Sequence, residues 1–159
     1  MEQKKEDNGE TIAKNMLEMS KLKVPVICVV IGEGSSGGAL ALGVGDKILM
    51  LENSVYSVLS PEGFASILYK DSTKNEEAAE KMKITAEDLK ELEIIDEIIK
   101  EPKGGAQKNP EEIYKVLQKN LLKNLKALKQ IESNTLIEQR YNKFRTIGQK
   151  YIILKENNI

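Results

Sequence analysis

The chain has 159 residues, enough for one domain with a hydrophobic core, and its formal net charge of −1 argues against nucleic acid as the main partner. The absence of histidine excludes histidine triads, general bases and metal ligands, and the single cysteine, Cys28, excludes an intrachain disulfide and a cysteine-cluster zinc site. No apolar run approaches about 18 residues, so we expect no membrane span, no signal peptide and, by default, a cytoplasmic location.

The first part of the chain predicts a tail, an amphipathic helix and a strand. Residues 1–8 are polar, and we expect them to form a disordered tail. Apolar residues at helical spacing predict a helix over residues 10–22, which Pro25 ends. The apolar, β-branched run at residues 24–31 predicts a strand buried on both faces, in which Cys28 is a small buried hydrophobe rather than a nucleophile.

A glycine-rich turn follows this strand and is the strongest functional signal in the sequence. Four glycines and two serines fall within seven residues: Gly32, Gly34, Ser35, Ser36, Gly37 and Gly38. From Ala39 on, good helix formers predict a short helix that Gly43 and Gly45 end. Backbone N–H groups at such a helix start have no intrahelical partner, so they can bind an anion or a developing oxyanion. We therefore interpret the turn as a site rather than a plain connection.

The rest of the chain predicts further strands and helices. They are strands over residues 47–51, 55–59 and 94–99, helices over residues 75–82 and 85–92, and helices that start at Ser60-Pro61, Asn109-Pro110 and near Ser133. The last two helices are amphipathic and have little sheet to cover, so we expect exposed apolar surface and an obligate oligomer. Residues 115–129 contain five lysines and no acidic residue. This pattern favours a solvated helix face; a binding patch for an anionic partner is the second interpretation.

Two other functions, dinucleotide binding and serine hydrolysis, are compatible with the glycine-rich turn but find little support in the rest of the chain. Residues 32–37 match the dinucleotide-binding pattern G-x-G-x-x-G, and Glu52 follows the second strand, but the helix after the turn is too short for that fold. A phosphate loop fails because no lysine follows Gly37. A serine hydrolase could use Ser36 with a lysine as base, although nothing marks which lysine would serve. A non-catalytic assembly module is the alternative outside enzymes.

Several separate motifs, in order along the chain, point to one family. They are residues 22–27 (Leu-Lys-Val-Pro-Val-Ile), the glycine-rich stretch 32–46, residues 56–63 (Tyr-Ser-Val-Leu-Ser-Pro-Glu-Gly), 65–68 and 104–110, and the pair Arg140-Tyr141. Together they resemble the carboxyltransferase α subunit of bacterial-type acetyl-CoA carboxylase, from about Gly9 to Tyr151. The resemblance implies an α/β, crotonase-like (ClpP/crotonase) ββα superhelix that is N-terminally truncated. It implies a single carboxyltransferase C-terminal-type domain over residues 1–159, with a ββα core at 9–103 and long C-terminal helices at 109–151.

The resemblance also implies a reaction, in which a carboxyl group moves from carboxybiotin to acetyl-CoA and forms malonyl-CoA for fatty-acid biosynthesis. Gly37 and Gly38 match the family's oxyanion hole for carboxybiotin, and the implied substrate-binding neighbours are Gly34, Ser35, Ser36 and Ala39. The resemblance implies no covalently bound cofactor, because in the family a carrier protein delivers the carboxybiotin, and acetyl-CoA is the substrate. The implied partners are a β subunit in an α2β2 complex, which carries the zinc, the biotin carboxyl carrier protein and biotin carboxylase.

Overall fold

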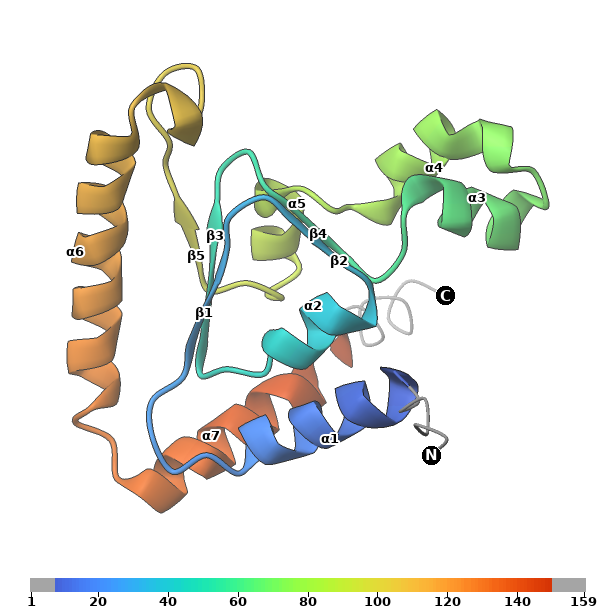
Figure 1. Cartoon of the computed structure of the whole chain (residues 1–159). Coiled ribbons are helices and arrows are strands. Elements are labelled where there is room, and N and C mark those ends of the chain that lie inside the picture. The colour runs from blue at the N-terminus through green and yellow to red at the C-terminus, as the bar shows by residue number, and fades with distance from the viewer. Residues whose placement is uncertain (1–7, 150–159) are drawn as a thin grey trace, which may run out of the picture.

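Two small parallel sheets form the centre of the structure, a computed structural model that describes residues 8–149 (Figure 1). The first sheet has the order β1-β3-β5, and its strands are Ile27–Val30, Lys47–Leu51 and Glu97–Ile99. The second sheet pairs β2 (Glu33–Ser35) with β4 (Val55–Ser57). Residues 1–7 of the predicted tail 1–8, and the end of the predicted C-terminal helices beyond residue 149, lie outside the described residues, whereas Asn8 already begins a helix.

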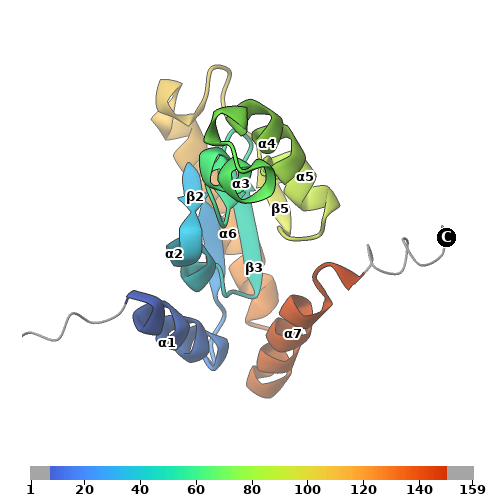
Figure 2. The same ribbon diagram turned by 90° about the vertical axis from the view of Figure 1, so that its right-hand side faces the viewer.

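Helices surround these sheets. Within residues 8–149 they are α1 (Asn8–Ser20), α2 (Ser36–Leu42), α3 (Pro61–Tyr69), α4 (Asn75–Met82), α5 (Ala86–Glu91), α6 (Pro110–Leu128) and α7 (Ser133–Thr146), with short 3-10 turns at Ser72–Lys74 and Ala106–Lys108. Helix α6 runs along one face of the first sheet, α1, α2 and α7 gather at one end of the domain, and α3 and α4 project from it as a pair (Figures 1 and 2).

Strand β3 is the central strand and supplies the core on both faces of its sheet. Side chains alternate along a strand, so Ile48 and Met50 point to one face and Leu49 and Leu51 to the other. The first pair packs in a cluster with residues of α5, and the second pair packs against Ile113 of α6. All four are buried, which makes β3 the strand that is covered on both faces.

The predicted helix starts at three positions are confirmed by their capping contacts. The side chains of Ser60, Thr85 and Asn109 accept hydrogen bonds from the backbone N–H groups of Gly63, Asp88 and Glu112, respectively. Such caps satisfy donors that have no partner inside the helix, and each contributes about 1 kcal/mol to stability. Local sequence therefore fixes where α3, α5 and α6 begin.

The prediction of a strand buried on both faces over residues 24–31 is wrong in extent and in burial. Strand β1 begins only at Ile27, because Pro25 has no N–H and the N–H of Val26 donates to Asp46 Oδ2 at 2.7 Å. All four of its residues are half-buried, Cys28 among them, because β1 lies at the edge of its sheet and pairs only with β3 among the described residues.

Three further strands and one helix differ from the prediction, among them β4, which ends at Ser57 rather than at residue 59. Strand β2 occupies part of the glycine-rich turn, and α2 starts at Ser36 rather than Ala39. Strand β5 is shorter than the predicted 94–99, because the N–H groups of Ile94 and Ile95 donate to Leu89 O and close the end of α5 instead of joining the sheet.

A buried ion pair joins the last described helix to the beginning of the fold. The guanidinium of Arg140, on α7, donates to both carboxylate oxygens of Asp46 at 2.9 and 2.8 Å, and the two side chains are only 1% and 3% exposed. It also donates to the backbone carbonyls of Met19, Leu22 and Val24 at 2.9–3.0 Å. We call this set the Arg140 clamp, and it fixes the segment between α1 and β1 against β3.

A second carboxylate beside the clamp makes stability depend on pH. Burial by itself raises the pKa of Asp96, but hydrogen bonds from Lys143 and from the N–H of Ile48, together with the charge of Lys47, outweigh burial and leave the pKa below its ordinary value. A carboxyl group whose pKa is lower in the folded state stabilises the fold above its unfolded pKa, and this contribution is lost as pH falls through the folded pKa.

We therefore expect acid to destabilise the wild-type chain more than the Asp96→Asn variant. Urea unfolding should give a free energy that falls between about pH 5 and pH 2 in both, more steeply in the wild type. Asp96→Asn should also be the less stable at neutral pH, since Lys143 then lacks a charged partner. Parallel pH profiles for the two proteins would contradict this assignment.

Candidate functional site

The predicted site residues form one continuous turn from strand to helix. Gly34 and Ser35 end β2, and Ser36, Gly37, Gly38 and Ala39 make the first turn of α2. Ser36 has φ of +67°, in the left-handed region, which costs a residue with a side chain about 1–2 kcal/mol. The structure thus brings these residues together on a sharply bent backbone that has local strain.

The first N–H groups of α2 lack a side-chain cap. Ser35 lies at the N-cap in an extended conformation, but its side chain makes no capping hydrogen bond. The opening amides of an α-helix have no carbonyl partner within the helix, so those of Gly37 and Gly38 suit an incoming acceptor. At Gly37 a Cβ would lie 3.2 Å from Ile12 Cδ1 of α1, whereas at Gly38 it would meet only Ser36 Oγ, at 3.9 Å. The space beside the Gly38 Cα, where a side chain would lie, is therefore open to a ligand.

Two side chains to which the sequence analysis assigned no role hold α2 in place. Tyr56 donates its hydroxyl proton to Ala39 O at 3.3 Å, and Asn15 Nδ2 donates to Ala41 O at 2.9 Å. These partners are 17 and 26 residues apart in the sequence, so no local spacing could have revealed them. Helix α2 is thus supported from β4 on one side and from α1 on the other.

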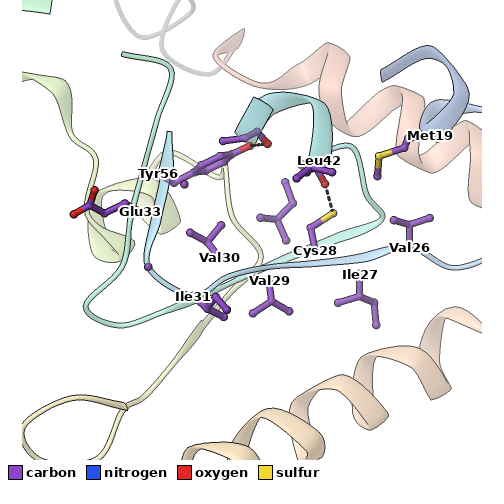
Figure 3. Close-up of a pocket in the computed structure, with 15 residues that line it drawn as sticks. Met19, Val26, Ile27, Cys28, Val29, Val30, Ile31, Glu33, Leu42 and Tyr56 are labelled. Carbon is purple, nitrogen blue, oxygen red and sulfur yellow. Dashed lines mark hydrogen bonds between the residues drawn. The ribbon is translucent and has the colours of Figure 1, made fainter. Parts of the chain in front are cut away.

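An apolar cavity of about 450 Å³ lies between β1 and α2, next to the turn (Figure 3). Most of its lining comes from the continuous segment 26–34, which includes β1, with Leu42 and Tyr56 opposite, and Glu33 is the one charged residue in that lining. Cys28 faces Leu42 and donates its Sγ–H to Leu42 O at 3.1 Å. Burial raises the pKa of the Cys28 thiol, which agrees with the prediction that it is no nucleophile. The cavity suits an uncharged group.

The geometry disfavours the alternative chemistries. No described residue forms a hydrogen bond with the Ser36 hydroxyl, so a serine hydrolase would find no base within residues 8–149. The Glu52 carboxylate accepts hydrogen bonds from Lys100 Nζ at 2.6 Å and from the N–H of Glu101. These bonds compete with the hydrogen bond to a ribose hydroxyl that dinucleotide binding would require. Helix α2 has seven residues, too few for a dinucleotide-binding crossover.

Residues 8–149 contain neither a cluster of metal-binding side chains nor a membrane-spanning helix. No group of three or more acidic or cysteine side chains is placed to hold a metal ion there. In the same part of the chain, none of the helices is both long enough and apolar enough to cross a membrane. What the turn offers is therefore backbone hydrogen-bond donors beside an apolar cavity.

Comparison with known proteins identifies the family. Residues 1–148 match the family model described as acetyl co-enzyme A carboxylase carboxyltransferase-like. The chain belongs to this family. The match includes the glycine-rich turn and the Arg140 clamp.

Relatives in the family carry the name acetyl-coenzyme A carboxylase carboxyl transferase subunit alpha. The chain is 61% identical to the one from Clostridium botulinum over 140 residues, which are 88% of this chain and 51% of the relative. It is 57% identical to the one from Clostridium acetobutylicum over 157 residues, 99% of this chain and 57% of the relative. A Natranaerobius thermophilus protein named subunits beta/alpha is 59% identical over 89% of this chain and 23% of its own length. The chain thus spans about half the length of the α-subunit relatives that it matches.

Solved structures confirm the predicted crotonase-like α/β fold. A Pseudomonas malonate decarboxylase hetero-tetramer in complex with coenzyme A matches 93% of this chain and 59% of its own, with a TM-score of 0.63 and 15% identity. A hetero-dimer of Pseudomonas malonate decarboxylase matches 74% of this chain and 49% of its own, with a TM-score of 0.55 and 13% identity. At these identities the likeness concerns the fold alone.

Proposed function

We propose that this chain carries the α-subunit share of a carboxyltransferase active site, which transfers a carboxyl group from carboxybiotin to acetyl-CoA and forms malonyl-CoA. The observation that carries the proposal is the family match across the turn at which Gly37 and Gly38 begin α2. The 57–61% identity to α subunits named for this reaction supports it. The dinucleotide-binding and hydrolase alternatives lack comparable support.

In this proposal the protein acts through backbone dipoles rather than through a titrating side chain. The bond between the carboxyl carbon and the biotin nitrogen breaks, which releases CO2 and leaves negative charge on the ureido oxygen. The N–H groups of Gly37 and Gly38 donate to that oxygen, and one such donor typically changes the rate about 10²–10³-fold. The biotin nitrogen then takes a proton from the acetyl methyl group, and the resulting carbanion bonds to CO2.

The remaining site residues would shape the place where carboxybiotin sits. Gly34, Ser35, Ser36 and Ala39 flank the two donors along the chain, and the apolar cavity lies beside them. The acetyl-CoA thioester would be held mainly by a β subunit, which would also carry the zinc. A relative that bears the beta and alpha names in one chain supports such a partner. The carrier protein, biotin carboxylase and a cytoplasmic setting complete the proposal.

Exposed apolar side chains next to the turn support assembly with a partner. Leu40 and Leu42 of α2 are 37% and 68% exposed, and Met16 and Leu17 of the adjacent α1 are 38% and 53% exposed. Apolar surface gathered around a site commonly marks a protein–protein interface. An obligate oligomer would cover this surface.

The decisive experiment measures carboxyl transfer by a chimera. Replacing the matching 57% of the Clostridium acetobutylicum α subunit with this chain keeps the rest of that relative in place. Mixed with β subunit, carboxylated carrier protein and acetyl-CoA, the chimera should form malonyl-CoA at a rate near that of the unmodified relative. A correctly assembled chimera with no malonyl-CoA formation, or tight binding of NAD by this chain, would overturn the proposal.

The pH dependence of the rate tests the mechanism separately. Because the chain has no histidine and the proposed donors are backbone amides, the chimera's kcat/KM should report no essential group of this subunit with a pKa near 6–7. The profile is measured for the chimera and for the unmodified relative with the same β subunit. A pKa near 6–7 that appears only when this chain is present would contradict catalysis by backbone amides. The unmodified relative provides the matched control.

A further inference from the structure

Tyr56 reaches across the whole turn from its place on β4. It lies opposite Gly34 in the register of β2 and β4, and its side chain is 9% exposed. A Cβ at Gly34 would lie 3.0 Å from Tyr56 Cδ2, so the ring fills the space beside that glycine. One edge of the ring therefore rests on the strand that leads into the turn.

The other end of the Tyr56 side chain touches the far end of α2. Its hydroxyl donates to Ala39 O (Figure 3). A Cβ at Gly43 would lie 2.3 Å from that hydroxyl oxygen. Two glycines, one before and one after the short helix, thus leave room for the same tyrosine. Gly37 and Gly38 lie between these two contacts.

We propose that Tyr56 is a positioning residue, which sets the direction of the Gly37 and Gly38 N–H groups by fixing α2 relative to β2. Helix α2 needs outside support, since it has seven residues, no side-chain cap and a strained Ser36 at its start. Burial raises the pKa of Tyr56, so its hydroxyl stays protonated and remains a donor at neutral pH. The inference rests on the proposed function, because it assigns Tyr56 a role in that reaction.

Removing the hydroxyl should lower turnover without changing substrate affinity much. In the assembled chimera, Tyr56→Phe should reduce kcat about three- to tenfold, the range expected for one net hydrogen bond. The KM for acetyl-CoA should stay within about twofold, since the thioester is assigned to the partner. Tyr114→Phe, at an exposed position on α6, is the matched control and should leave both constants unchanged.

A pair of variants separates positioning from general loss of stability. Gly43→Ala should reduce kcat more than Tyr56→Phe, because the added methyl group displaces the tyrosine hydroxyl. In the double variant that hydroxyl is gone and only the contact of 3.1 Å with Ala39 O stays tight, so kcat should rise above that of Gly43→Ala. A kcat of the double variant below those of both single variants would overturn the proposed role of Tyr56.

A spectroscopic measurement tests the geometry without carboxyl transfer. With ¹⁵N-glycine labelling of this chain in the chimera, the amide signals of Gly37 and Gly38 should shift in Tyr56→Phe and not in Tyr114→Phe. Unchanged signals together with an unchanged kcat would overturn the role of Tyr56 while leaving the proposed function standing. Full activity in a Gly38→Val variant would instead place the oxyanion hole elsewhere and remove the positioning role of Tyr56, whichever way the signals move. The proposed function itself falls if the correctly assembled chimera forms no malonyl-CoA.

Discussion

Replacing Gly38 with valine should keep the ligand oxygen away from the backbone N–H that valine retains, and should leave folding intact. Carboxyl transfer should then fall about 10²–10³-fold, the typical effect of losing one oxyanion donor. The structure sharpens this expectation. Gly38 does not have a positive φ, and a Cβ there would meet only Ser36 Oγ at 3.9 Å. Valine is therefore tolerated by this chain itself, and the loss must come from the ligand that approaches the backbone.

The experiment compares kcat of three variants in the chimera, with assembly checked by sedimentation. Gly63→Val adds the same side chain on α3, where a Cβ makes an ordinary 3.5 Å contact, and it should keep near-normal activity. Ser36→Ala should cost at most a few-fold, because the Ser36 hydroxyl is assigned no chemistry. A serine hydrolase would show the reverse order, with Ser36→Ala inactive. Near-normal transfer by Gly38→Val would mean that the oxyanion hole lies elsewhere.

Replacing Arg140 with methionine should destabilise the fold by about 3–5 kcal/mol, the usual cost of removing one partner from a buried ion pair. The variant leaves the Asp46 carboxylate buried without its cation, and the carbonyls of Met19, Leu22 and Val24 lose their donor. Since domains are stabilised by only about 5–15 kcal/mol, this loss leaves the variant marginal at 37 °C.

Urea unfolding of the purified chains measures the effect. Arg145→Met, on the same helix at an exposed position, is the matched control and should change the free energy of unfolding by no more than about 0.5 kcal/mol. The double variant Asp46→Asn/Arg140→Met removes the unpaired charge and should regain part of the loss. A change below about 1 kcal/mol in Arg140→Met would contradict the role of the clamp.

Features that depend on neighbouring residues were predictable from the sequence. The helix starts at Ser60, Thr85 and Asn109 follow from local capping chemistry, and all three are confirmed. The short helix after the glycines was also predicted, since Gly43 ends a run of good helix formers. The position of the candidate site followed from the same local signal.

Features that depend on distant partners were not predictable. Strand β2 has the sequence Glu-Gly-Ser, which has no apolar alternation, and it exists because β4 pairs with it from 22 positions further along the chain. Residues 24–31 resembled a central strand, but only the order β1-β3-β5 reveals that they lie at an edge. Arg140 belonged to a recognised motif, yet its burial against Asp46, 94 residues away, is a property of the fold alone.

The Arg140 clamp also constrains the order in which the protein can mature on the ribosome. Asp46 is synthesised 94 residues before the arginine that neutralises it. Until α7 has emerged, a nascent chain must keep that carboxylate, and the carbonyls between α1 and β1, in contact with water, because burying them without a partner is too costly. The contacts of the clamp thus become available only after all the strands of the first sheet have been synthesised. The share of native stability that comes from the clamp can therefore be gained only once α7 is available.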